Sequence, residues 1–189
     1  MTMPPPEETI WSAGTIFTVG HSTRTQEEFI ALLRAYGIEC LVDIRTVPRS
    51  RHNPQFNADA LHEALNRHGI EYVALPRLGG LRKAQKDSPN TGWRNASFRG
   101  YADYMQSDEF ARGLAHLVAI SRQRRAAIMC AEAVPWRCHR SLVADALIIR
   151  DIPVVEILSE TDYRPHKLTN FARVEGTSIR YPPEQARLL

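Results

Sequence analysis

Short apolar runs alternate along this chain with segments whose apolar residues recur every three or four positions. The spacing places several apolar side chains on one face of each predicted helix, for example Phe29, Leu32, Leu33 and Tyr36. The runs themselves are of a length typical of buried strands, and they cover residues 15–19, 40–44, 71–75, 126–129 and 153–158. Strands that alternate with helices in this way predict right-handed crossovers and a mainly parallel sheet.

Local signals mark the ends of the predicted helices. Thr25 and Glu28 have the spacing of a capping box, in which each side chain satisfies a free backbone amide. Gly37 supplies a left-handed stop, and Ser107 is predicted to cap a later helix. We therefore predict an α/β fold: a single three-layer domain with a mainly parallel five-stranded sheet flanked by helices.

The chain divides into three parts. Residues 1–12 contain several prolines and are expected to form a disordered N-terminal lead-in. Residues 13–160 hold the α/β domain. Residues 161–189 are expected to form a C-terminal extension that packs on the same domain, with a hairpin around Glu175 and Gly176.

The composition bounds the class of protein. The balance of 43% hydrophobic and 24% charged residues is that of a globular protein, and no apolar run approaches the roughly 20 residues that span a membrane. The N-terminus lacks the pattern of an export signal, and three cysteines suit reduced thiols, so a cytoplasmic location is expected. No cofactor is predicted, and the oligomeric state is not predicted.

Charge is distributed unevenly, although the net charge is only +3. Residues 76–100 contain a single acid, Asp87, against the basic residues Arg77, Arg82, Lys83, Lys86, Arg94 and Arg99. Residues 45–56 contain three arginines and no acid. Such local basicity favours a small anionic or phosphorylated ligand as partner, or nucleic acid, while a solvated loop surface is the simpler alternative.

Polar and reactive side chains follow the predicted strands where each strand ends. His21 and Ser22 follow the first strand, Asp43 and Arg45 end the second, and Cys130 and Glu132 follow the fourth, ahead of Arg137, Cys138, His139 and Arg140. Because parallel strands end at one edge of a sheet, these side chains are expected to converge on one arginine-rich site. We predict His21, Asp43, Cys130 and Glu132 as catalytic candidates, and as anion-binding candidates Ser22, Arg45, Arg49, Arg137, His139 and Arg140.

Most of these residues also have a structural interpretation. His21 can be a loop or capping histidine, and Asp43 can form a structural pair with Arg45, since both lie on one face of a strand. Glu132 can act as a base or accept a hydrogen bond from a sugar hydroxyl. Arg140 lies in a first helical turn, where a cation opposes the dipole, and an anion bound there would compensate.

The cysteines have different surroundings. Cys40 opens a strand and is expected to be a core thiol. Cys130 and Cys138 lie near a helix start and arginines that can activate a thiol, although a buried inert thiol is the alternative for each. Zinc is not predicted: Cys130, Cys138 and His139 lack a paired short-spacing motif, and only His21 is an obvious fourth ligand.

Several of these strings together resemble an uncharacterised family, catalogued as domain of unknown function 488. The resemblance covers nearly the whole chain and implies a compact α/β domain without an established activity. It rests on Thr18-Val-Gly-His-Ser22, Leu41-Val-Asp-Ile-Arg45, Pro48-Arg49-Ser50, Met129-Cys-Ala-Glu132, Cys138-His-Arg140 and Leu168-Thr-Asn-Phe-Ala-Arg-Val174.

Two features are more loosely similar to rhodaneses and cysteine phosphatases: the strand Leu41-Val-Asp-Ile-Arg45 and the cysteine that ends the fourth strand. The loop after Cys130 departs from theirs. It is longer before Arg137, it has no glycine, Pro135 removes an amide donor, and Glu132 would repel an oxyanion if it faced inward.

Three classes of function remain open. The first is an enzyme, a hydrolase or transferase, that acts on a phosphate-bearing or nucleotide-like ligand, with a Cys130 nucleophile or with Glu132 as acid and base. The second is a non-catalytic nucleic-acid-binding protein that uses Arg49, Arg51, Arg82, Lys83, Trp93 and Arg94. The third is a redox or metal sensor built on Cys130 and Cys138.

Overall fold

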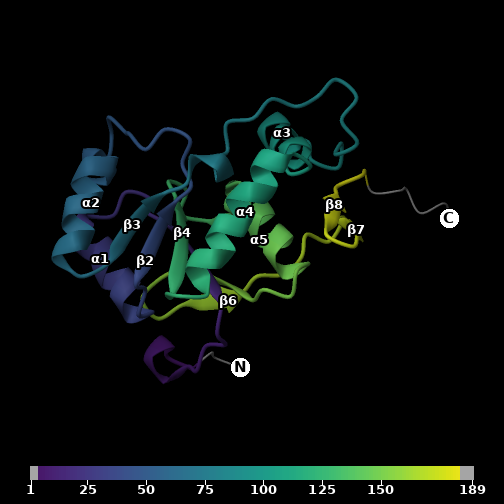
Figure 1. The fold of residues 1–189 in the computed structure, drawn as a ribbon. Coiled ribbons are helices and arrows are strands. Elements are labelled where there is room, and N and C mark those ends of the chain that lie inside the picture. The colour runs from purple at the N-terminus through teal and green to yellow at the C-terminus, as the bar shows by residue number, and fades with distance from the viewer. Residues whose placement is uncertain (1–3, 184–189) are drawn as a thin grey trace.

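A six-stranded mixed sheet forms the centre of the computed structural model, which describes residues 4–183 (Figure 1). The strands follow the order β3-β2-β4-β1-β5-β6 across the sheet. Their bounds are β1 Ile16–Gly20, β2 Cys40–Asp43, β3 Glu71–Ala74, β4 Ala126–Cys130, β5 Val154–Ile157 and β6 Tyr163–Pro165. The first five run parallel, which confirms the predicted sheet, and β6 adds an antiparallel edge strand that the sequence did not reveal.

Helices cover both faces of the sheet and complete the three layers (Figure 1). On one face α1, Gln26–Ala35, and α2, Ala58–Arg67, bury Phe29, Leu33 and Leu61 against the strands. The other face is covered by α3 Ala96–Tyr104, α4 Asp108–Ser121 and α5 Arg140–Ile148, whose apolar side chains form a second core.

The predicted helix signals have their expected geometry. Thr25 accepts a hydrogen bond from the amide of Glu28, and the Glu28 carboxylate accepts one from the amide of Thr25, so the capping box is complete. Ser107 likewise caps α4 through the amide of Phe110. Gly37 has a φ of 61°, the left-handed conformation that ends α1 at little steric cost.

The strand order places the chemistry-bearing strands next to one another. β4 lies between β2 and β1, although it follows both along the chain. The chain leaves β1 and β2 over the face of α1 and α2, and it leaves β4 over the opposite face through α5. Connections that diverge in this way open a crevice at the carboxyl ends of the strands, where open α/β sheets bind ligands.

The C-terminal extension is attached to the domain through a buried polar network. The side chain of His166 lies between two buried carboxylates, at 2.8 Å from Asp145 on α5 and 2.6 Å from Glu156 on β5. Arg164 donates to the other oxygen of Glu156, and the Tyr181 hydroxyl donates to Asp145. Between these anchors, β7 Arg173–Glu175 and β8 Ser178–Arg180 form the hairpin expected around Glu175 and Gly176. Residues 184–189 lie outside the described residues.

The described part of the expected lead-in contacts the domain. Pro6–Glu8 form one 3-10 turn, and Trp11 packs edge-on against Phe17 at 5.1 Å and Tyr163 at 5.0 Å between ring centroids. Residues 1–3 lie outside the described residues. Among residues 4–183, no helix combines the length and the apolar character that crossing a membrane requires.

Candidate functional site

A cavity of about 520 Å³ opens at the carboxyl ends of β1, β2 and β4. Its volume suits a small-molecule ligand. The structure brings together at its wall most of the residues predicted from the strand ends: His21, Arg45, Arg49, Cys130, Glu132, Arg137, Cys138 and His139.

The other predicted residues lie behind this wall. Asp43 and Arg140 are buried beneath it, and Ser22 is half-buried beside it. Residues that the sequence did not assign to the site complete the wall: Thr46, Val47, Ser50 and Asn53 beside Arg49, then Gly80, Leu81 and Asn95 before α3, Ser97 and Phe98 in α3, and Ala131 beside Cys130. The polar residues among them carry no spacing signal, so only the three-dimensional path of the chain identifies them.

Asp43 and Arg45 form a bidentate ion pair. Arg45 Nε donates to Asp43 Oδ1 at 2.9 Å and Nη2 donates to Oδ2 at 2.6 Å. The Asp43 carboxylate also accepts the Tyr72 hydroxyl at 2.7 Å and the Arg45 backbone amide at 3.1 Å. With both oxygens engaged and the side chain buried, this geometry supports a structural role for Asp43, which holds Arg45 at the cavity.

His21 contributes a neutral imidazole. Its Nδ1 lies 2.8 Å from the carbonyl oxygen of Ser22, which can only accept, so Nδ1 carries the proton. Its Nε2 then offers a lone pair to Arg45 Nη1 at 3.4 Å. Burial lowers the pKa of His21, and the ring stacks on Phe56 with 4.3 Å between centroids.

The loop after β1 and the loop after β4 are held against each other. The amide of His21 donates to the carbonyl of Cys130, and the amide of Ser22 donates to that of Ala131. Ser22 adopts a φ of 52°, a left-handed conformation that is uncommon for a residue with a side chain. A Cβ on Gly20 would lie 1.8 Å from the carbonyl oxygen of Glu132, so only glycine allows this approach.

Arg140 is a buried guanidinium without a carboxylate partner among residues 4–183. Its Nη1 donates to Thr18 Oγ1 at 2.8 Å and its Nη2 to the carbonyl of Glu132 at 2.6 Å, while Nε has no partner among the described residues. The side chain therefore fixes the Glu132 backbone and brings a positive charge to the start of α5, where the helix dipole opposes it.

The sulfurs of Cys130 and Cys138 lie within 4.8 Å of each other. The neighbouring Cys138 thiol raises the pKa of Cys130, with burial acting in the same direction. The neighbouring Cys130 thiol lowers the pKa of Cys138, although burial opposes that change. Cys130 is half-buried and Cys138 is buried, and both border the cavity. The remaining thiol, Cys40, is buried in the core, and burial raises its pKa to about 11.

His139 stands beside this thiol pair in a fixed orientation. Its Nε2 lies 3.3 Å from the carbonyl oxygen of Ile44, and its Nδ1 lies 3.6 Å from the sulfur of Cys138. The ring packs on Tyr101 with 4.9 Å between centroids. The backbone of Gly80 approaches so closely that a Cβ there would lie 2.4 Å from Nδ1.

Arg49 and Arg137 are the exposed cations of the cavity wall. Neither forms an ion pair within residues 4–183. Within the described part of the chain, Glu132 is the single carboxylate of that wall, and it is exposed. The cavity therefore combines two unpaired guanidiniums with one carboxylate and two thiols.

Much of the basic segment 76–100 has local structural partners. Arg77 pairs with Glu109, and the guanidinium of Arg82 lies 3.6 Å from the centroid of the Tyr104 ring. Trp93 is half-buried, and its ring packs against Phe98, with 4.9 Å between centroids. This packing weakens the interpretation of the segment as a basic surface with an aromatic ring free to stack on bases.

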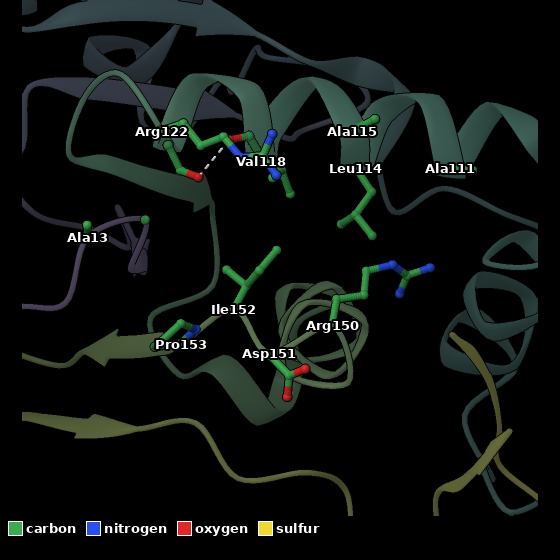
Figure 2. A pocket seen from close by; sticks show the side chains of 12 residues that line it. Ala13, Ala111, Leu114, Ala115, Val118, Arg122, Arg150, Asp151, Ile152 and Pro153 are labelled. Carbon is green, nitrogen blue, oxygen red and sulfur yellow. Dashed lines mark hydrogen bonds between the residues drawn. The ribbon is translucent and has the colours of Figure 1, made fainter. Parts of the chain in front are cut away.

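A larger cavity, of about 670 Å³, lies at the other end of the sheet, near the starts of β1 and β5. Figure 2 shows Leu114 on α4 pointing toward Arg150 and Ile152 across this space. Its wall contains Arg122, Arg150 and Asp151 but none of the residues predicted to react. Size alone therefore does not identify the functional site.

Comparisons with known proteins identify a family. The model of the family described as domain of unknown function DUF488 matches residues 25–147. No curated protein and no solved structure matches the chain. The likeness to rhodaneses and cysteine phosphatases is not supported by these comparisons.

Proposed function

Because the chain belongs to the family described as domain of unknown function DUF488, a description that specifies no activity, we propose a function from the site itself. The protein is an enzyme that binds a small phosphate-bearing anion at the carboxyl ends of β1, β2 and β4 and acts on it there. One observation carries this proposal: Arg49 and Arg137 border a cavity of about 520 Å³ without ion-pair partners among the described residues.

The surrounding groups suit an anion. Arg45 presents a guanidinium whose position is fixed by Asp43, and planar guanidiniums bind phosphate oxygens in a two-pronged manner. Arg140 adds a positive charge below the wall that no carboxylate among residues 4–183 neutralises. The reacting group lies among Cys130, Cys138 and Glu132, which border the same cavity.

Binding of inorganic phosphate, pyrophosphate and a nucleoside monophosphate, measured by calorimetry, tests the proposal. We expect saturable binding that Arg49→Ala and Arg137→Ala each weaken about 10- to 100-fold, the loss of a charge-assisted hydrogen bond worth about 1.5–3 kcal/mol. Arg67→Ala is the matched control, because Arg67 lies on α2 and pairs with Glu63. Absence of saturable binding, or variants that bind as tightly as the wild type, would refute the proposal.

Turnover is tested with a panel of phosphate esters, by the release of phosphate or the alcohol. Cys130→Ser, Cys138→Ser and Glu132→Gln then assign the reacting group, since each removes one candidate and leaves Arg49 and Arg137 in place. If the protein binds phosphate but turns over no ester, it is an anion-binding protein and not an enzyme. Binding to single-stranded nucleic acid with a steep salt dependence would favour the alternative class.

A further inference from the structure

We propose that Cys130, Cys138 and His139 form a zinc site whose fourth coordination position opens into the cavity. The two sulfurs and an imidazole nitrogen all lie within 4.8 Å of one another. Cys130 ends β4, whereas Cys138 and His139 immediately precede α5, so the fold and not a short sequence motif brings the three ligands together.

The distance between Cys138 and His139 matches metal coordination. In a tetrahedral zinc site, with Zn–S of about 2.3 Å and Zn–N of about 2.0–2.1 Å, a sulfur and a nitrogen ligand lie about 3.6 Å apart. The sulfur of Cys138 lies 3.6 Å from Nδ1 of His139. The pair thus stands at coordination distance without any movement of the chain.

The imidazole is also held in the tautomer that a metal requires. The Ile44 carbonyl can only accept, so the His139 Nε2 that faces it at 3.3 Å carries the proton. Nδ1 is then left with a lone pair directed to the thiols. A backbone carbonyl in this position is a common outer-shell partner of zinc-binding histidines. Gly80 and Tyr101 pack on the ring and restrict its rotation.

The chemistry of the three ligands indicates which metal binds and what net charge the site carries. Two thiols and an imidazole suit zinc, whereas calcium and magnesium prefer oxygen ligands. Two thiolates neutralise a divalent cation, so the site adds no net charge next to Arg140. All three residues border the cavity, which leaves a fourth position for a water molecule or an oxygen of the bound ligand. Only this last role rests on the proposed function.

Metal titration of the full chain tests the inference. The protein is reduced, stripped with a chelator and titrated with Zn²⁺ alone or with Co²⁺ alone. We expect one metal per chain and, for Co²⁺, the absorption bands of a tetrahedral thiolate site. Cys130→Ser, Cys138→Ser and His139→Gln should each weaken zinc binding by at least about 100-fold, more than the about 10- to 100-fold loss on removing an outer-shell partner.

Two control variants each remove a thiol or an imidazole that lies away from the proposed site. Cys40→Ala removes the core thiol, and His68→Gln removes an exposed imidazole; both should bind zinc as the wild type does. If a ligand variant fails to fold, as judged by circular dichroism, Gly80→Ala provides a second measurement. Its Cβ displaces the His139 ring, so it should weaken zinc binding while both thiols remain.

The outcomes separate this inference from the proposed function. Absence of a stoichiometric zinc ion under reducing conditions, or Co²⁺ bands that persist in Cys138→Ser and His139→Gln, overturns the zinc site. A Cys130–Cys138 disulfide on mild oxidation, with no metal binding after reduction, assigns the pair to redox chemistry instead. Phosphate binding without zinc leaves the proposed function intact. If the wild type binds no phosphate but zinc binding is unchanged in Arg49→Ala and Arg137→Ala, the proposed function is refuted and the zinc site is retained.

Discussion

Replacement of His166 by glutamine should remove a pH-dependent part of the protein's stability. His166 lies between Asp145 and Glu156, with only 5% of its side chain exposed. Burial alone would lower its pKa, but hydrogen bonds to the two carboxylates outweigh burial and raise the pKa from 6.5 to about 9. The folded protein thus stabilises the protonated His166 side chain relative to its neutral form.

The size and sign of the effect follow from linkage. At about 1.4 kcal/mol per pH unit, a pKa raised from 6.5 to about 9 contributes about 3 kcal/mol to the free energy of unfolding. Because the folded pKa is the higher one, this contribution is complete below pH 6.5 and is lost as the pH rises through about 9. The charged groups near the imidazole that share the network are Asp145, Glu156 and Arg164.

Urea unfolding of the wild type and His166→Gln between pH 6 and 10 measures the effect. The difference in unfolding free energy between the two proteins should shrink by about 3 kcal/mol across this range. Groups that titrate in both proteins cancel in that difference. Parallel pH profiles would refute the reasoning, as would an NMR titration of the His166 ring with a midpoint at or below the ordinary 6.5.

Three further substitutions test separate parts of the fold. Gly20→Ala should destabilise the protein by more than about 3 kcal/mol or prevent folding, because its Cβ meets the Glu132 carbonyl at 1.8 Å; thermal unfolding measures this. Thr25→Ala should cost about 1 kcal/mol in urea unfolding through loss of the α1 cap, and an unchanged midpoint would contradict the capping role. Tyr181→Phe should cost about 1–3 kcal/mol, since buried Asp145 loses a donor; a variant as stable as the wild type would show that the bond contributes nothing.

The local elements could be predicted from the sequence because their signals are local. The five apolar runs form five parallel strands. The ends of α1 are marked as expected by the capping box of Thr25 and Glu28 and by Gly37. The order of the strands could not be derived, because nothing in an apolar run specifies its neighbour. The sixth strand was missed because β6 is only three residues long and has one buried side chain.

Most of the predicted site residues border one cavity, but the sequence did not predict the other residues of its wall. Strand ends identified the cavity wall from His21 to His139, whereas the loops that bring Asn53 and Gly80 to it have no periodicity to read. The network around His166 was missed although a signal existed. Glu156 stands in an apolar strand and Asp145 in an apolar helix, and a carboxylate in such a position requires a partner, as it did for Asp43.

The strand order also governs when the site can assemble during synthesis. β1 and β2 do not pair with each other; each pairs with β4, which emerges about a hundred residues after the first of them. Until residues 126–130 are available, each of these strands keeps an unpaired edge facing where β4 will lie. Such long-range pairing slows folding and leaves unpaired, aggregation-prone strand edges exposed on the nascent chain. Cys130 is the last residue of that inserted strand, so the side chain that β4 contributes to the candidate site reaches it in the same event that joins β1 and β2 into one sheet.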